Sequence, residues 1–380
     1  MENKSNNMGQ QGLRDSVMDA GLCTGCGACV NLCPYQKAFK DHTIVLFPCD
    51  LEEGRCYAYC PRTPVDMEAL RQQFFDAGDI TPEIGPIKGF YVARASDAAL
   101  RDKAQHGGCV SALVSLALEE GIIDHALLAK GEANLLPHSV DAATPAEVCV
   151  LAGSKLVVSP TVAEFNLVAK GEAQRIGVVA TPCQALALTK MRTKPIPTED
   201  NLIDKLSLII GVFCGWAFDW RDLKALIETR VALEDFAGMD IPPSKYHCLE
   251  VFTKAGDTIA IDLDEVEPCV RNACHYCSDM TAEFSDISVG SARLDEGWEE
   301  ARGWNQIIVR TKLGLELIEK AKEKGVLEFH EVPEGNLERL KKASMSKKRT
   351  AVANLQKLSG TAGDLVYLDP EDPVFSTLLG

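Results

Sequence analysis

The feature that most constrains this chain is a cysteine-rich run near its N-terminus, CTGCGACVNLCP, which begins at residue 23. Its spacing is C-x2-C-x2-C-x3-C-P, and a loop with this spacing supplies thiolates to an iron–sulfur cubane. The small residues between the cysteines let the backbone wrap a cluster and aim N–H groups at its sulfides. A structural zinc site takes two cysteines from each knuckle and has no use for a third and fourth at this spacing. The run therefore predicts iron–sulfur chemistry at Cys23, Cys26, Cys29 and Cys33.

A second, altered cysteine run follows at residues 49–61, with the spacing C-x6-C-x3-C-P. In two-cluster proteins of the ferredoxin type, the fourth cysteine of one run ligates the cluster held by the other run. If the first cluster takes four cysteines, only three are left for a second cluster, which would lack one thiolate. A carboxylate such as Asp50 or Glu53 as the fourth ligand, a three-iron cluster, or no second cluster would each fit. We favour a second cluster. The first cluster is assembled from Cys23, Cys26, Cys29 and Cys60, and the second would take Cys33, Cys49 and Cys56.

The composition narrows the class of protein. The chain has 380 residues, enough for two or three domains, and its net charge of −16 argues against binding nucleic acid. Its longest nearly apolar run, residues 206–218, is too short and too interrupted by glycine to span a membrane. The polar N-terminus lacks the pattern of a signal peptide, so we expect a cytoplasmic protein. Fifteen cysteines in that compartment indicate metal binding rather than disulfides.

Four further cysteines predict another cluster in the middle of the chain. Cys274 and Cys277 form a C-x2-C pair, which on its own fits a zinc knuckle or two buried thiols as well. Two predicted strands, at residues 175–180 and 206–213, are each followed by a cysteine, and open α/β sheets bind their ligands at such strand ends. Four thiolates meet the requirement of a cubane, and Cys269 is a competing ligand. The predicted ligands are Cys183, Cys214, Cys274 and Cys277.

The remaining pattern predicts a fold of the α+β or α/β class in three parts. Residues 1–80 form a ferredoxin-like iron–sulfur domain, residues 81–311 a mixed α/β domain, and residues 312–380 a helical segment and tail. Within the second part, Gly107 and Gly108 lead into an apolar helix. A helix N-terminus at a glycine turn suits a phosphate or a flavin edge, although a glycine pair there is more often an ordinary turn.

Taken together, these motifs resemble the beta-subunit family of coenzyme F420-reducing hydrogenases and dehydrogenases. The resemblance covers nearly the whole chain and rests on CTGCGACVNLCP, HGGCVSALVSLALEEGIID, GSK with a following Ser-Pro, ATPCQALAL, GVFCGW, ACHYCSDMTAEFSDISVGS and GWNQIIVRTKLG. It implies an FAD held in the α/β domain beside a [4Fe-4S] cluster. Two departures are a cysteine at position 109, where a small or apolar residue is usual, and the incomplete second cysteine run. The implied flavin site is Gly107, Gly108, Ser111, Ser154, Lys155, Thr181, Gln184, Ser288, Gly290 and Arg310.

The resemblance also implies an activity. FAD would exchange a hydride with coenzyme F420, and two or three [4Fe-4S] clusters would pass single electrons to a partner oxidoreductase. That partner would be a formate dehydrogenase, a hydrogenase or a heterodisulfide reductase-like module, so the chain would be part of a hetero-oligomer. No catalytic side chain is predicted, because the sequence shows no arrangement typical of a nucleophile and its base. Alternatives are an NAD(P)- or ferredoxin-linked member of the same fold, a chlorophyll-type reductase, an electron relay without flavin, or a zinc scaffold.

Overall fold

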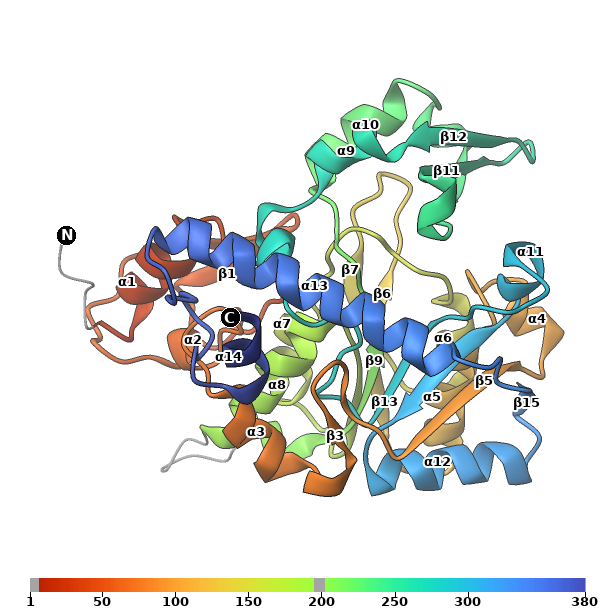
Figure 1. Cartoon of the computed structure of the whole chain (residues 1–380), viewed down its shortest axis with the longest axis horizontal. Coiled ribbons are helices and arrows are strands. Elements are labelled where there is room, and N and C mark those ends of the chain that lie inside the picture. The colour runs from red at the N-terminus through yellow and green to blue at the C-terminus, as the bar shows by residue number, and fades with distance from the viewer. Residues whose placement is uncertain (1–6, 195–201, 380) are drawn as a thin grey trace.

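An eight-stranded mixed sheet forms the centre of the molecule (Figure 1). The computed structural model describes residues 7–194 and 202–379. In order across the sheet, the strands are β15 (Leu327–His330), β5 (Gly89–Ala95), β14 (Asn305–Val309), β13 (Ile287–Ser291), β9 (Leu206–Val212), β8 (Ile176–Ala180), β6 (His125–Lys130) and β7 (His138–Ala142). β13, β9, β8 and β6 run parallel, so their carboxyl ends meet at one edge. Ligands of open α/β sheets bind at such an edge.

Helices cover both faces of this sheet, which is why its central strands read as continuous apolar runs. One face packs against α5 (Cys109–Glu119), α6 (Pro145–Val150) and α12 (Lys312–Glu323). The other packs against α7 (Thr161–Val168), α8 (Pro182–Thr193), α13 (Asn336–Ser359) and α14 (Pro373–Leu379). The long α13 crosses the front of the molecule in Figure 1. Among the described residues, no helix is both long and apolar enough to cross a membrane.

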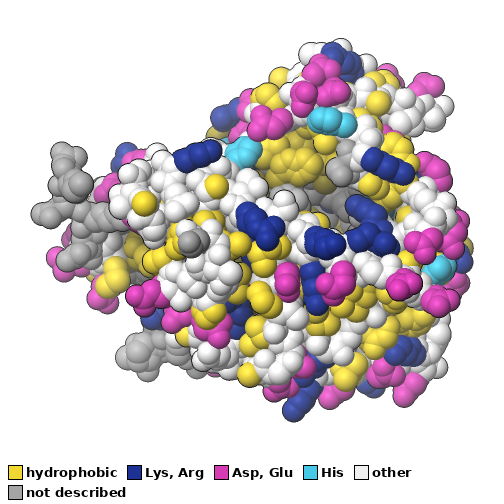
Figure 2. Space-filling view, in the orientation of Figure 1, with side chains coloured by type: hydrophobic (Ala, Val, Ile, Leu, Met, Phe, Trp, Pro, Cys, Tyr) yellow, Lys and Arg dark blue, Asp and Glu magenta, His cyan; other side chains and the backbone are white. Residues whose placement is uncertain are grey.

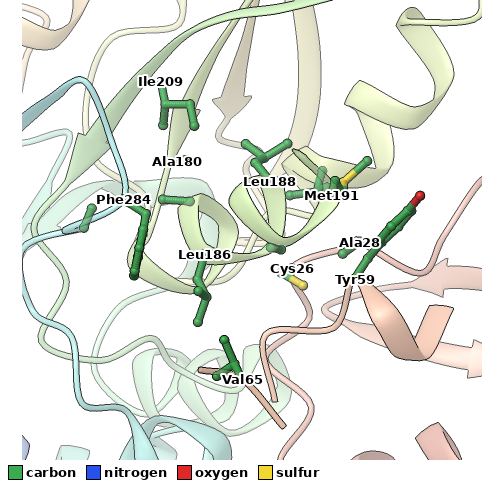
Figure 3. Close-up of a cluster of buried hydrophobic side chains, with 14 of the residues drawn as sticks. Cys26, Ala28, Tyr59, Val65, Ala180, Leu186, Leu188, Met191, Ile209 and Phe284 are labelled. Atoms are coloured by element: carbon green, nitrogen blue, oxygen red, sulfur yellow. The ribbon is translucent and has the colours of Figure 1, made fainter. Parts of the chain in front are cut away.

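Residues 7–80 are a small, loop-rich unit that packs directly on α8. Cys26, Tyr59 and Val65 share a hydrophobic cluster with Leu186 and Met191 of that helix (Figure 3). The unit also has a small cluster of its own around Leu13, Val17 and Leu22, which touches the body at Ala163. Its elements are α1 (Gln10–Leu13), the π-helix η1 (Arg14–Met18), β1 (Gln36–Phe39), β2 (His42–Val45), α2 (Arg55–Ala58), α3 (Met67–Phe74), η2 (Ala77–Asp79) and β3 (Ile80–Thr81).

A lobe that the sequence did not predict rises between β9 and β13 (Figure 1). Its three antiparallel strands are β10 (Phe236–Asp240), β11 (Cys248–Thr253) and β12 (Thr258–Asp262). Leu223, Leu249 and Ile261 belong to its own hydrophobic core, so the lobe is a distinct packing unit. The other elements of this region are α9 (Trp220–Glu228), η4 (Leu233–Asp235), η5 (Ser244–Tyr246), α10 (Leu263–Val266), η6 (Glu267–Cys269) and η7 (Asn272–Tyr276).

The C-terminal part, expected to be a helical segment and tail, also contributes a strand to the central sheet. β15 lies between α12 and α13 and pairs antiparallel with β5. β15 has only four residues, so its alternation of apolar and polar side chains is too short to be recognised in the sequence. Its pairing with β5, which is far away along the chain, stabilises it. The remaining elements are β4 (Gly85–Pro86), α4 (Ala98–Arg101), η3 (Leu202–Lys205) and α11 (Trp298–Ala301).

Candidate iron–sulfur and cofactor site

The first cysteine group brings together the four thiols of Cys23, Cys26, Cys29 and Cys60. Burial raises the pKa of Cys29 well above its ordinary value, and the nearby Cys23, Cys26 and Cys60 raise it further. Four thiolates this close repel one another unless a cation lies among them, which fits a metal cluster. The backbone N–H of Arg62 also donates to Cys60 Sγ at 3.5 Å. Hydrogen bonds from the surrounding protein to a ligand sulfur are usual at metal sites. Both arrangements suit an iron–sulfur site.

Glycine is required where the loop of this first group folds tightly. Gly25 and Gly27 have φ angles of +70° and +86°, which L-residues with a side chain seldom adopt. A Cβ on Gly27 would also fall 2.7 Å from the backbone nitrogen of Ala163. These two glycines let the cysteine loop turn against the body of the protein.

The second cysteine group contains three thiols, those of Cys33, Cys49 and Cys56. Burial raises the pKa of Cys56, and the thiols of Cys33 and Cys49 raise it further, which places the three together. Cys33 is exposed to solvent. The side chains of Asp50 and Glu53 are exposed as well. The structure therefore shows three thiols here, at the surface, as the spacing predicted.

The third cysteine group lies at the carboxyl edge of the parallel strands. Cys183 follows β8 and Cys214 follows β9, while Cys274 and Cys277 lie on the turn η7 and just after it. Burial raises the pKa of Cys214, and Cys274, Cys183 and Cys277 raise it further, so the four thiols are neighbours. The competing Cys269 packs instead in the core of the lobe.

The first and third groups lie near each other. After burial, the strongest influence that raises the pKa of Cys26 is the thiol of Cys183. The hydroxyl of Thr24 interacts with both thiols and lowers the pKa of each. Cys56 and Cys60 both come from the short segment around α2, which links the second group to the first. The three groups thus form a succession from the exposed Cys33 to the interior.

Buried cations accompany these groups. Lys190 Nζ donates to the Cys60 carbonyl at 2.7 Å, and burial lowers the pKa of this lysine to about 8. At the third group, Lys347 Nζ donates to the Cys214 carbonyl at 2.9 Å. Burial raises the pKa of Cys277, but Lys347 and Arg62 outweigh it and lower that pKa overall. Positive charge near the thiols favours the ionised form that binds metal.

A cavity of about 330 Å³ opens beside the third group. Trp216, His275 and Lys347 line it together with Cys274 and Cys277, so it brings a molecule from solvent next to this group. Figure 2 shows a hollow between the lobe and the body, with Lys and Arg side chains along its rim. Basic side chains concentrated here, in a chain of net charge −16, favour an anionic ligand.

The glycine pair predicted for the flavin site packs closely against β14. A Cβ on Gly107 would lie 2.9 Å from Asn305 Oδ1, and Gly108 has a φ angle of +77°. The same Asn305 Oδ1 accepts from the backbone N–H of Cys109 at 3.1 Å and so caps α5. Ser111 is buried one turn further on. Packing alone therefore accounts for both glycines.

The next predicted residues lie close to the same sheet edge and are engaged in local hydrogen bonds. Lys155 Nζ donates to carbonyls at the end of α6, including that of Leu151 at 2.9 Å, and burial lowers its pKa to about 8. Ser154 is exposed. Thr181 and Gln184 form a capping box at the start of α8, where their side chains satisfy helix N–H groups.

Three predicted cofactor residues are engaged in packing and internal hydrogen bonds. All five N–H donors of Arg310 are used within the protein, on Ser288 Oγ and on groups of residues 84, 86 and 281. Ser288 is fully buried and is held by this same arginine. A Cβ on Gly290 would lie 2.1 Å from the ring of Phe213, so this glycine makes room for that ring. A cofactor role for the three residues stays a prediction.

Sequence reasoning missed a cluster of buried polar side chains, the polar cluster, where the lobe meets the sheet. Gln105, His106, Trp298 and Arg302 each have a buried polar atom without a hydrogen-bond partner, four of the ten such atoms in the described residues. His106 stacks edge-on against Trp298 at 5.9 Å and faces Asp240 of the lobe at 3.9 Å. Buried polar groups normally have partners, so this cluster indicates a bound ligand or water. In the sequence, the signal for this polar cluster was His106, the histidine of the HGG motif.

Thiol groups in succession on a mixed α/β body define an iron–sulfur electron-transfer protein. Residues 17–36 match the family described as "4Fe-4S binding domain". Residues 90–164 and 173–335 match the N- and C-terminal regions of "Coenzyme F420 hydrogenase/dehydrogenase, beta subunit". The chain belongs to this coenzyme F420 hydrogenase/dehydrogenase beta-subunit family, and it is an oxidoreductase subunit.

Individual relatives agree with this assignment. The coenzyme F420 hydrogenase subunit beta of Methanococcus voltae is 32% identical, over 70% of this chain and 92% of the relative. The corresponding protein of Methanothermobacter thermautotrophicus, also a coenzyme F420 hydrogenase subunit beta, is 31% identical, over 72% of this chain and 95% of the relative. A chain of the F420-reducing [NiFe] hydrogenase complex from Methanosarcina barkeri superposes with a TM-score of 0.67. It is 26% identical and covers 73% of this chain and 94% of its own length.

Proposed function

We propose that this subunit couples hydride exchange with coenzyme F420 at an FAD to one-electron transfer through [4Fe-4S] clusters to a partner oxidoreductase. The observation that carries the proposal is the succession of three thiol groups, which joins a cavity in the body to an exposed surface. Bound FAD would accept or donate a hydride as a two-electron unit and exchange single electrons with a cluster. The relatives named for coenzyme F420 favour that carrier.

In this proposal, the cysteines divide into ligand sets as the structure groups them. The first and third groups each provide four thiolates, which is the complement of a [4Fe-4S] cluster. The second group provides three, so its cluster either contains three irons or takes a ligand that is not a thiolate. A carboxylate such as that of Asp50 or Glu53 would serve, since both are exposed beside the group. The protein accordingly holds two or three clusters.

The cofactor and the carrier would bind around the carboxyl edge of the sheet. The cavity beside Cys274 and Cys277 places a redox group next to the third cluster. The predicted flavin residues around this edge include Gly107, Gly108, Ser111, Ser154, Lys155, Thr181 and Gln184. Residues of the polar cluster, such as His106 and Arg302, would add hydrogen-bond partners for a carrier that binds below the lobe.

A partner subunit would dock on the exposed second group. Six of the eleven large hydrophobic side chains that are exposed in the described residues lie between positions 8 and 51. Phe47 and Leu51, which are 61% and 63% exposed, flank Cys49. Tyr35 contacts Phe47 with ring centroids 6.4 Å apart and lies two residues after Cys33. An apolar patch around an exposed redox site suits the catalytic subunit of a hydrogenase, a formate dehydrogenase or a heterodisulfide reductase-like module.

The deciding experiment uses the full chain, purified without oxygen and reconstituted with FAD. We expect about one flavin per chain, eleven to twelve iron atoms if three clusters form, and reduction of the bound flavin by reduced F420. Reduction by NADH and not by reduced F420 would overturn the choice of carrier. Iron and sulfide without any flavin would favour the electron relay without flavin. The cap that Asn305 places on the N-terminus of α5 would then explain why no flavin binds at that helix.

A further inference from the structure

We infer that Arg62, a residue of the N-terminal unit, is a positioning residue for the cluster of the third group. Its Nε–H donates to that cluster, and its charge raises the reduction potential of that cluster. This role deepens the proposed function, since it rests on the third group as a cluster site. It also assigns to the N-terminal unit a part in a redox centre whose ligands all come from the body.

The side chain of Arg62 reaches across the boundary between the two units. The residue follows Cys60 and Pro61 of the first group in sequence. Its guanidinium lies against the turn that carries the third group, where Nη2 donates to the Ala273 carbonyl at 3.1 Å and Nη1 to the Tyr276 carbonyl at 3.3 Å. Each of these carbonyls directly precedes a ligand cysteine. Arg62 therefore fixes the turn from which two of the four thiolates project.

One donor of this guanidinium is left without an acceptor. Arg62 is only 5% exposed, and its Nε has no hydrogen-bond partner in the described part of the chain. The strongest influences that raise the pKa of Arg62 are the Tyr367 hydroxyl and the thiols of Cys277, Cys183 and Cys274, all three of the third group. Arg62 acts more weakly on one thiol of the first group, Cys60, whose pKa it lowers after Lys190 does. A buried guanidinium N–H is seldom left unpaired in a native protein. Its position among three ligand thiols makes a cluster sulfide or a ligand sulfur the acceptor.

The charge of Arg62 is also uncompensated by a carboxylate. Arg271 crosses the same boundary in the opposite direction, but its Nη1 forms an ion pair with the buried Asp41 at 2.5 Å. No ion pair of this kind joins Arg62 to a carboxylate in the described residues. A buried, unneutralised cation next to a cluster stabilises the reduced form, which carries one more negative charge, and so raises the potential.

The test is a redox titration of the full holoprotein followed by EPR, with the third cluster identified as the signal that Cys277→Ser removes. Arg62→Gln should lower the midpoint potential of this signal by at least a tenfold change in the one-electron equilibrium, about 59 mV. Arg62→Lys keeps the charge and loses the Nε donor, so its potential should fall between those of the wild type and the Gln variant. The matched control is Arg55→Gln, an exposed arginine of the same unit, which should leave the potential unchanged.

An unchanged potential in Arg62→Gln, with iron content equal to that of the wild type, would overturn the inference. If Arg62→Gln fails to retain iron, Arg62→Lys decides: a lowered potential supports the role, and a wild-type potential refutes it. A potential that falls equally in Arg55→Gln would also refute it, because the effect would then be one of general charge. The readout is the potential of one cluster, so the inference can fail while reduction by F420 stands, and it can hold if another carrier is used.

Discussion

Replacing Asp372 by asparagine should destabilise the protein through a buried network of four charges. Arg71 Nη1 lies 2.8 Å from Asp372 Oδ2, and its Nη2 lies 3.2 Å from Glu283 Oε1. Lys348 Nζ lies 3.7 Å from the other oxygen of Glu283. No side chain of the four is more than 1% exposed. The network ties α3, α13 and the C-terminal segment to the loop that follows Cys277.

The size of the effect follows from the charge balance. Two buried cations face two buried anions, and the partly exposed Glu68 lies 3.4 Å from Arg71 Nη1 as well, so Asp372→Asn removes one of the two buried negative charges. Removing one partner of a buried pair costs about 3–5 kcal/mol when the other charge is left alone. Here Glu283 still pairs with Arg71, and the asparagine oxygen can still accept a hydrogen bond, so we expect a loss of about 2–3 kcal/mol in the free energy of unfolding.

The assay is thermal unfolding of the reconstituted protein, followed by circular dichroism without oxygen at one fixed scan rate. With an unfolding entropy of about 2.1 cal/mol/K per residue, a loss of this size lowers the Tm of a chain of 380 residues by about 2.5–4 °C. Glu371→Gln removes the same charge from the exposed neighbouring residue and is the matched control, with a shift of about 1 °C or less. Equal Tm values for the two variants would refute the reasoning about the network.

Three other predictions concern the clusters, the partner and acid stability. Cys277→Ser should remove the EPR signal of one cluster, whereas Cys269→Ser should retain full iron content, and loss of iron in both would contradict the ligand assignment. Phe47→Asp should abolish electron transfer to the partner subunit and leave reduction of an artificial one-electron dye unchanged, with Leu167→Asp as an exposed control of similar size. Burial alone would raise the pKa of Glu283, but Lys348 and Arg71 lower it to about 2. Because the folded pKa lies below the unfolded value of about 4.3, the stability from Glu283 is complete above that value and declines toward pH 2, which Tm measured against pH would show.

The cysteine groups could be predicted from the sequence because ligand spacing within a loop is a local property. The strand-end argument also placed Cys183 and Cys214 together, since parallel strands bring their carboxyl ends to one edge. The roles of Arg310 and Gly290 could not be predicted in this way. Their partners, such as Phe213 and the carbonyl of Ile84, are far away in sequence, and only the packed structure shows that these contacts are occupied.

The lobe and the role of Arg62 escaped prediction for related reasons. β10, β11 and β12 are short strands inserted between two strands of the main sheet, and no motif marks where the insertion begins. Arg62 lies in an ordinary CPRTP segment, and its importance depends on the turn at Ala273, over 200 residues away. Long-range hydrogen bonds of this kind leave no periodic signal in a single sequence.

The packing of the N-terminal unit on α8 has a consequence for the speed of electron transfer. Cys26, Tyr59 and Val65 sit in the same hydrophobic cluster as the helix, so the unit is not a tethered domain that swings between a donor and an acceptor (Figure 3). The spacing between successive redox centres is then constant from one turnover to the next. Solvent viscosity should therefore slow the arrival of the carrier and of the partner, and leave the internal transfer of electrons unaffected.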